Sequence, residues 1–188
     1  TLYNHLVIAQ EAAYNCYIQH DDFAILSVSP ELFFKKKGNR LITRPMKGTI
    51  TRGYSTKEDL GNKIWLANDS KNRAENMMIV DLLRKDMGRI SEICSVKVTK
   101  FCEVEQYSTV WQMTSTIESQ LQSDKSLLDI FSVLFHCGSI IGAPKIATMA
   151  IINQLEKQPR GVYCGTIGIC LLNGDAIFNI GICIIQKP

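Results

Sequence analysis

The chain has 188 residues, 46% of them hydrophobic, which is enough to bury one sizeable core, so we expect one domain or a large part of one. The formal net charge of +3 is too small to predict nucleic-acid binding, and no apolar run approaches the roughly 18 residues of a membrane span. The seven cysteines are odd in number and include no C-x-x-C pair, which argues against a disulfide framework or a zinc site and favours a reducing compartment, with the cytoplasm as the default.

The first part of the chain predicts a helix followed by strands. Apolar residues recur at helical spacing from Leu2 to Ala13, and residues 23–28 form an apolar run typical of a buried strand. Residues 31–36 and 40–46 alternate as the two strands of a hairpin. This region is therefore expected to supply the first strand pair of a sheet.

The register of this hairpin decides which side chains face one another. A three-residue loop at 38–40 would place Glu31 directly opposite Lys47 on one face, whereas a two-residue loop would place them on opposite faces. We predict the three-residue loop, because a carboxylate facing an amine is chemically useful. Lys47 stands between a proline and Gly48, which fixes its position, although spacing alone favours an ordinary solvated lysine.

Residues 57–87 predict one helix or two, closing on Gly88 as the C-cap. Glu75 falls on the helical stripe that is expected to face inward. A carboxylate in that position needs a partner. Spacing favours a buried salt bridge, with Arg73 or Lys145, over a metal ligand.

The second half of the chain predicts strands, then helices. Residues 92–104 and 107–118 alternate as strands, and residues 127–135 form a short amphipathic helix. A further helix over 143–155 begins with a proline in its first turn, and its free backbone N–H groups suit an anionic ligand. The mix of hairpins and helices indicates an α+β fold.

A second hairpin is expected over residues 165–185. Its Asn-Gly pair at 173–174 is a strong signal for a two-residue turn. That turn would place Cys164 opposite Cys183, which we expect to remain two thiols in a reducing compartment.

Five short motifs, in order, span most of the chain. They are SPELF at 29–33, PMKGT at 45–49, RAEN with IVDL at 73–82, GAPK at 142–145 and GTIG at 165–168. Together they resemble the chorismate-utilising enzymes, the family of anthranilate synthase, isochorismate synthase and aminodeoxychorismate synthase component I. Lys47 resembles the aminodeoxychorismate synthases most, because the anthranilate synthases carry alanine at that position.

The resemblance implies a fold and a reaction. The fold would be two antiparallel β-sheets packed as a sandwich with flanking helices. The reaction would convert chorismate and ammonia to 4-amino-4-deoxychorismate in folate precursor synthesis, with Mg²⁺ as cofactor. A separate glutamine amidotransferase subunit would supply the ammonia.

The resemblance also implies roles for individual residues. Glu31 would act as acid and base at the hydroxyl group that leaves, and Lys47 would attack the ring as a covalent nucleophile. Glu75 would bind Mg²⁺. The substrate-binding residues would be Thr49, Gly142, Tyr163, Gly165 and Thr166.

The chain departs from the family pattern in three positions and in length. Cys183 stands where an arginine is expected, Ile141 where threonine is expected, and Asn72 where an acidic residue is usual. The family extends beyond both ends of this sequence, so we expect residues 1–188 to be a partial chorismate-binding catalytic domain. Two alternatives follow: a non-catalytic, truncated remnant of the family, and, as the alternative enzyme, anthranilate synthase component I.

Overall fold

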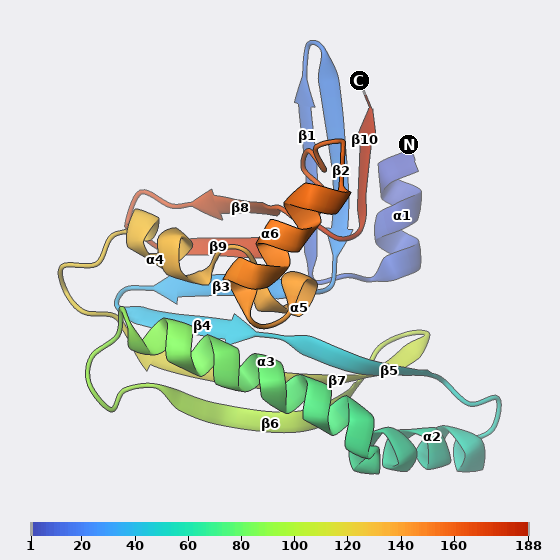
Figure 1. The fold of residues 1–188 in the computed structure, drawn as a ribbon. Coiled ribbons are helices and arrows are strands. Elements are labelled where there is room, and N and C mark those ends of the chain that lie inside the picture. Colours follow the sequence, from blue (N-terminus) through green and yellow to red (C-terminus); the bar gives the residue numbers. More distant parts are fainter. Residues whose placement is uncertain (1, 188) are drawn as a thin grey trace.

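The computed structural model describes residues 2–187 as two antiparallel sheets with helices outside them (Figure 1). The smaller sheet has the order β1-β2-β10 and the larger the order β5-β7-β4-β3-β9-β8, with β6 also paired to β7. The small-sheet strands are β1 (Tyr14–His20), β2 (Phe23–Ser29) and β10 (Ile184–Lys187). The large-sheet strands are β3 (Leu32–Lys37), β4 (Arg40–Arg44), β5 (Met46–Thr51), β6 (Lys97–Gln106), β7 (Val110–Gln120), β8 (Thr166–Cys170) and β9 (Ala176–Ile180). These features confirm the α+β fold with two antiparallel sheets and flanking helices.

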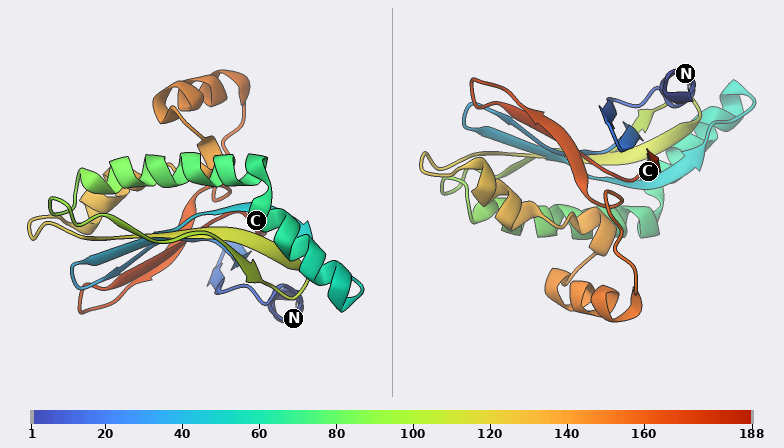
Figure 2. Two further views of the ribbon diagram at one scale, coloured as in Figure 1. Left: turned by 90° about the horizontal axis from the view of Figure 1, so that it is seen from below. Right: turned by 90° about the horizontal axis from the view of Figure 1, so that it is seen from above.

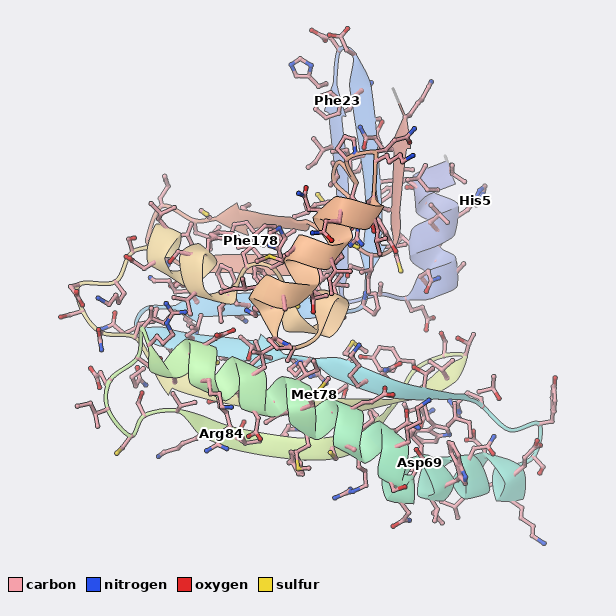
Figure 3. The ribbon with its side chains drawn as sticks, in the orientation of Figure 1. His5, Phe23, Asp69, Met78, Arg84 and Phe178 are labelled. Carbon is pink, nitrogen blue, oxygen red and sulfur yellow. The ribbon has the colours of Figure 1, made fainter. Side chains whose placement is uncertain are left out.

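Two consecutive helices cover one face of the larger sheet. The helix α2 (Thr56–Asn68) begins at Ser55, whose hydroxyl accepts the N–H of Glu58, and α3 (Ser70–Gly88) begins at Asp69. Figure 3 labels Asp69 at the junction of α2 and α3. The predicted helical region thus forms two helices, but Gly88 is the last helical residue and Arg89 takes the C-cap position.

The main core lies between α3 and the larger sheet. Ile79, Leu83 and Met87 of α3 pack with Phe34 and Ile117 of the sheet, and each of the five is at most 4% exposed. Burying a side chain of this size contributes roughly 1.5–3 kcal/mol, so this layer holds α3 firmly in place. The views in Figure 2 show α3 lying along the sheet.

The remaining helices differ in how closely they pack. The helix α4 (Leu127–Leu134) begins with a capping box formed by Ser126 and Asp129, and α5 (Gly138–Ile141) is a single turn. The helix α6 (Lys145–Leu155) has no buried residue and stands away from the sheets in both views of Figure 2. The N-terminal α1 (Leu2–Gln10) lies beside the smaller sheet.

Three local predictions are wrong. The helix at the start ends at Gln10 instead of reaching Ala13, and residues 14–20 form β1, each paired with a residue of β2. The first hairpin has a two-residue turn, because Lys37 pairs with Arg40 and Gly38 adopts a φ of 55°. The third error lies in the second hairpin.

The second hairpin closes with a three-residue loop. The N–H of Leu171 donates to the carbonyl of Asp175, so the Asn-Gly pair lies within a longer loop in which Gly174 has a φ of 83°. The pairing shifts by one residue as a result, and the N–H of Cys164 donates to the carbonyl of Gly181. Cys164 therefore does not face Cys183, and both remain free thiols.

Across residues 2–187, no single helix is both long and apolar enough to cross a membrane. Only the bent pair formed by Leu127–Ile141 and Lys145–Leu155, at 67° to each other, reaches that length and composition.

Candidate active site

The SPELF motif holds a buried carboxyl group at the junction of the two sheets. The hydroxyl of Ser29 donates to the carbonyl of Ile180 at 2.6 Å and accepts the N–H of Glu31 at 3.3 Å. The side chain of Glu31 is 5% exposed, and its Oε1 accepts the N–H of Met46 at 3.4 Å. The turn between β2 and β3 thus aims Glu31 at the start of β5.

Lys47 reaches the same region from β5. It is half-buried, and its Nζ donates to the carbonyl oxygen of Ser139 in α5 at 2.7 Å. The next residue, Gly48, has a φ of 87°, and a Cβ there would lie 3.0 Å from Asn72 of α3. Glycine therefore permits both the backbone turn and the close approach of α3 that position Lys47.

The hairpin register does not place Glu31 opposite Lys47 as predicted. Leu32 pairs with Arg44, and the pairing slips between Leu32 and Lys35. A second irregularity lies in the pairing of β5 with β7, between Met46 and Thr49. These bulges re-aim the side chains, so the Lys47 ammonium still exerts its charge on the Glu31 carboxyl.

Burial dominates the protonation of Glu31. It raises the pKa of this carboxyl above its ordinary value, because the charged form loses its water. A side-chain hydrogen bond from Ser139, the N–H of Met46 and the charge of Lys47 act in the opposite direction without cancelling the effect. The site thus favours a carboxyl group that holds its proton, as a general acid requires.

Glu75 does not point into the core, contrary to the prediction. Its side chain is 46% exposed and lies 3.9 Å from Lys71, one helical turn away. The next residue, Asn76, takes the inward position, where its Oδ1 accepts the hydroxyl of Ser115 at 2.5 Å. The buried partner expected for Glu75 is also absent, because Lys145 pairs instead with Asp86 at 2.5 Å.

The described residues do not form a metal site by themselves. Between residues 2 and 187, no group of three or more His, Cys, Asp or Glu side chains could hold a metal ion. The amide of Asn72 donates to the carboxylate of Asp69, the N-cap residue of α3, at 2.8 Å. Asn72 and Asp69 thus bond to each other, and this contact does not point either side chain toward Glu75. One half-exposed carboxylate does not make an octahedral Mg²⁺ site, and Mg²⁺ binding at Glu75 stays a prediction.

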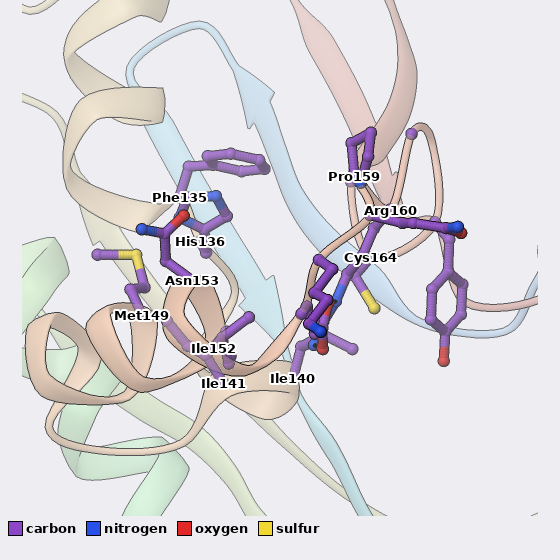
Figure 4. Close-up of a pocket in the computed structure, with 16 residues that line it drawn as sticks. Phe135, His136, Ile140, Ile141, Met149, Ile152, Asn153, Pro159, Arg160 and Cys164 are labelled. Atoms are coloured by element: carbon purple, nitrogen blue, oxygen red, sulfur yellow. Dashed lines mark hydrogen bonds and ion pairs between the residues drawn. The ribbon is translucent and has the colours of Figure 1, made fainter.

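A cavity of about 540 Å³ lies between α5, α6 and the segment that precedes β8 (Figure 4). Tyr163 and Gly165, two predicted substrate-binding residues, contribute to its wall, as do Ile140 and Ile141 of α5. Its volume lies in the range of small-molecule sites. Glu31 and Lys47, both within the described part of the chain, are not among its lining residues.

The other predicted substrate-binding residues lie apart from this cavity. The hydroxyl of Thr49 donates to Gln112 of β7 at 2.6 Å, and the hydroxyl of Thr166 donates to the carbonyl of Asn179 at 2.5 Å. Gly142 has a φ of 73°, and a Cβ added there would meet no atom within 4 Å, so only its backbone conformation demands glycine. The Glu31 carboxyl thus bonds to the backbone of Met46, directly before Lys47, whereas Tyr163 and Gly165 lie together at a separate wall.

Two further residues of the site, Ser139 and Cys137, carry no sequence signal of their own. Ser139 contacts Lys47 through its carbonyl oxygen, and its hydroxyl lies 3.0 Å from the Sγ of Cys137. A backbone contact leaves no trace in residue type, so only the position of Ser139 three residues before the GAPK motif could have drawn attention to it.

Comparison with known proteins places this geometry in a family. A model of the chorismate binding enzyme family matches residues 1–187. Aminodeoxychorismate synthase component 1 of Bacillus subtilis is 42% identical over 95% of this chain, and anthranilate synthase component 1 of Neisseria meningitidis is 38% identical over 96%. The chain spans 38% of the first protein and 37% of the second.

Solved structures agree on the fold. Anthranilate synthase component I from Streptococcus pneumoniae superposes with a TM-score of 0.89 at 34% identity, over 98% of this chain and 40% of that one. A putative isochorismate synthase from Bacillus anthracis superposes at 0.84 with 20% identity, over 99% of this chain and 51% of that one, which shows the shared fold alone. With five motifs in order and a family match over residues 1–187, this chain belongs to the chorismate binding enzymes.

Proposed function

We propose that this chain carries the Lys47–Glu31 centre of an aminodeoxychorismate synthase component I, which converts chorismate and ammonia to 4-amino-4-deoxychorismate and water. The observation that carries the proposal is the hydrogen bond from the N–H of Met46, the residue before Lys47, to the buried carboxyl of Glu31. The sequence relationship to the Bacillus subtilis enzyme supports the same reaction.

Each side chain has a task that its surroundings support. The amine of Lys47, in its neutral form, uses its lone pair to form a C–N bond to the ring. The buried carboxyl of Glu31 gives its proton to the 4-hydroxyl group, which leaves as water. Ammonia then forms the new C–N bond as the bond to Lys47 breaks, which releases the neutral amine of Lys47. The new ammonium group gives one proton to the Glu31 carboxylate, so both side chains return to their starting states.

The partners of this reaction follow from its chemistry. Ammonia must come from a donor, and we propose a glutamine amidotransferase subunit, in keeping with the component 1 naming of the relatives. Mg²⁺ would neutralise carboxylate charge on the substrate when bound, with Glu75 as one ligand. The bond changes themselves belong to Lys47 and Glu31.

The test is turnover of chorismate by the full-length protein with ammonia and Mg²⁺, followed by mass analysis of the product. Lys47→Ala is expected to abolish amination while leaving the fold intact. Lys57→Ala, an exposed lysine on α2, is the matched control and should retain full activity. Normal turnover by Lys47→Ala would exclude the nucleophile role.

Anthranilate synthase is the second candidate, because the Neisseria meningitidis relative and the Streptococcus pneumoniae structure carry that name. Lys47 disfavours it on the family pattern. The same mass analysis separates the two reactions, since anthranilate has lost the enolpyruvyl side chain that 4-amino-4-deoxychorismate keeps. A protein that turns over chorismate in neither way would be the non-catalytic remnant.

A further inference from the structure

The helix α6 turns an apolar stripe toward the cavity, although the helix has no buried residue of its own. Met149 and Ile152 lie about one helical turn apart on this stripe, and both line the cavity. Ile140 and Ile141 of α5, together with Phe135, add further apolar side chains to the wall (Figure 4). A ligand with an apolar body would therefore gain free energy by leaving water for this wall.

The end of α6 and the loop after it supply the charged residues of the cavity. Glu156, Lys157 and Arg160 line it and leave one net positive charge. Burial lowers the pKa of His136, another lining residue, and the charges of Lys145 and Arg160 lower it further, so this imidazole adds no charge at neutral pH. The cavity therefore suits a ligand with a single negative charge.

Arg160 offers a contact for that charge. Its Nε donates to Oε2 of Glu156 at 2.7 Å and its Nη2 donates to the other carboxylate oxygen, so Glu156 occupies one edge of the planar guanidinium. The second edge, formed by the two Nη atoms, has the fork geometry that binds a carboxylate with two hydrogen bonds. Within residues 2–187, Glu156 is the one carboxylate that forms an ion pair with Arg160, whose side chain is 31% exposed and thus open to a ligand.

We propose that this cavity binds a small apolar monocarboxylate, with its carboxylate on the second edge of Arg160 and its apolar body against Met149 and Ile152. Glu156 fixes the plane of the guanidinium before the ligand arrives, which lowers the cost of ordering Arg160 on binding. The site goes beyond the proposed function, because Glu31 and Lys47, both described by the structure, do not line it. Chorismate, with two negative charges, carries one more than the lining offsets.

The test is isothermal titration calorimetry of the full-length protein with cyclohexanecarboxylate and with cyclohexanecarboxamide, a neutral probe of nearly the same shape. The acid should bind about tenfold more tightly than the amide, because only the acid forms a charge-assisted pair with Arg160. Arg160→Met should remove this difference by weakening the binding of the acid and leaving the amide unchanged. Arg160→Lys keeps the charge but loses the fork, so its affinity for the acid should be intermediate.

Arg84→Met is the matched control, because Arg84 pairs with Asp81 on α3 and, among the described residues, is not part of the cavity wall; it should leave both affinities unchanged. Ile152→Ala removes apolar surface from the wall and should weaken both probes by the same factor. The comparison of acid and amide in the unsubstituted protein tests the charge contact even if a variant fails to fold. Equal affinities there, or an Arg160→Met variant that binds the acid as well as Arg84→Met does, would overturn the proposal.

Competition with chorismate separates this proposal from the proposed function. Tyr163 and Gly165, the substrate-binding residues predicted from the sequence, also line the cavity, so the competition is measured directly. Chorismate should leave the affinity for cyclohexanecarboxylate unchanged, and displacement of the acid by chorismate would overturn the assignment of a separate ligand. Binding of the acid without turnover of chorismate would keep this site and refute the proposed function, whereas turnover without binding of the acid would refute this site alone.

Discussion

The ion pair between Lys145 and Asp86 ties the start of α6 to the end of α3. The two charged atoms are 2.5 Å apart, and both side chains are only 13% exposed. The Nζ of Lys145 also donates to the carbonyl of Leu134 at 3.1 Å. Lys145→Met would leave the carboxylate of Asp86 buried without its counter-ion and would remove a donor from the carbonyls of Val133 and Leu134.

Removing one partner of a buried pair typically costs about 3–5 kcal/mol, and the residual exposure of this pair places our expectation near 3 kcal/mol. Urea unfolding measures the loss as a lower midpoint at an unchanged slope. The control is Arg84→Met, which breaks the ion pair between Arg84 and Asp81. The side chains of that pair are 53% and 56% exposed. Such exposed pairs contribute about 0–1 kcal/mol.

The double variant Asp86→Asn with Lys145→Met should recover part of the lost stability, because no charge then remains buried. The reasoning is refuted if Lys145→Met costs no more than Arg84→Met, or if the double variant is less stable than both single ones.

Three further predictions concern stability and reactivity. Gly168→Ala should destabilise the protein by roughly 2–4 kcal/mol, because the added Cβ would lie 2.1 Å from a backbone oxygen of β9. Gly61→Ala within α2 is the control: its added Cβ would have no atom within 4 Å, and the substitution should stabilise the protein by about 0.5–1 kcal/mol. Thermal unfolding of the two variants measures both effects. Since burial raises the pKa of Glu31, the folded protein holds a proton that the unfolded chain has already released, so stability falls as pH rises above the ordinary pKa of a glutamate. Glu31→Gln should remove this fall, and a stability difference from the unsubstituted protein that stays constant with pH would contradict it. A thiol reagent at pH 8, followed by mass spectrometry, should label the exposed Cys94 at once and the buried Cys137 only after unfolding.

Much of the fold could be predicted because its signals are local. The helical region 57–87 carries periodic apolar residues and capping residues, and the larger strands alternate in the expected way. The first hairpin shows the limit of this approach. Counting residues across a turn assumes uninterrupted pairing, and the bulge after Leu32 breaks that assumption. The Glu31 carboxyl therefore reaches the backbone next to Lys47 for a reason other than the one that predicted it.

The prediction for Glu75 failed for a different physical reason. Helical spacing locates an inward face to within about one residue, and here the buried face includes Asn76, a polar residue that the hydrophobic pattern ignores. Asn76 is fully buried, and the hydroxyl of Ser115 on β7 donates to its Oδ1, while its Nδ2 is buried without a partner among the described residues. That partner is 39 residues away in sequence, so no local pattern could reveal it.

The helix α3 acts as a fixed spacer between two functional segments. Near its start Asn72 abuts Gly48, beside the candidate nucleophile, and near its end Asp86 holds Lys145. At 1.5 Å per residue these two contacts are about 21 Å apart along the axis, and inserting one residue between them would rotate one end by about 100° against the other. Evolution can therefore lengthen the loops that flank α3 with little penalty, but it can alter the helix between these contacts only by substitution.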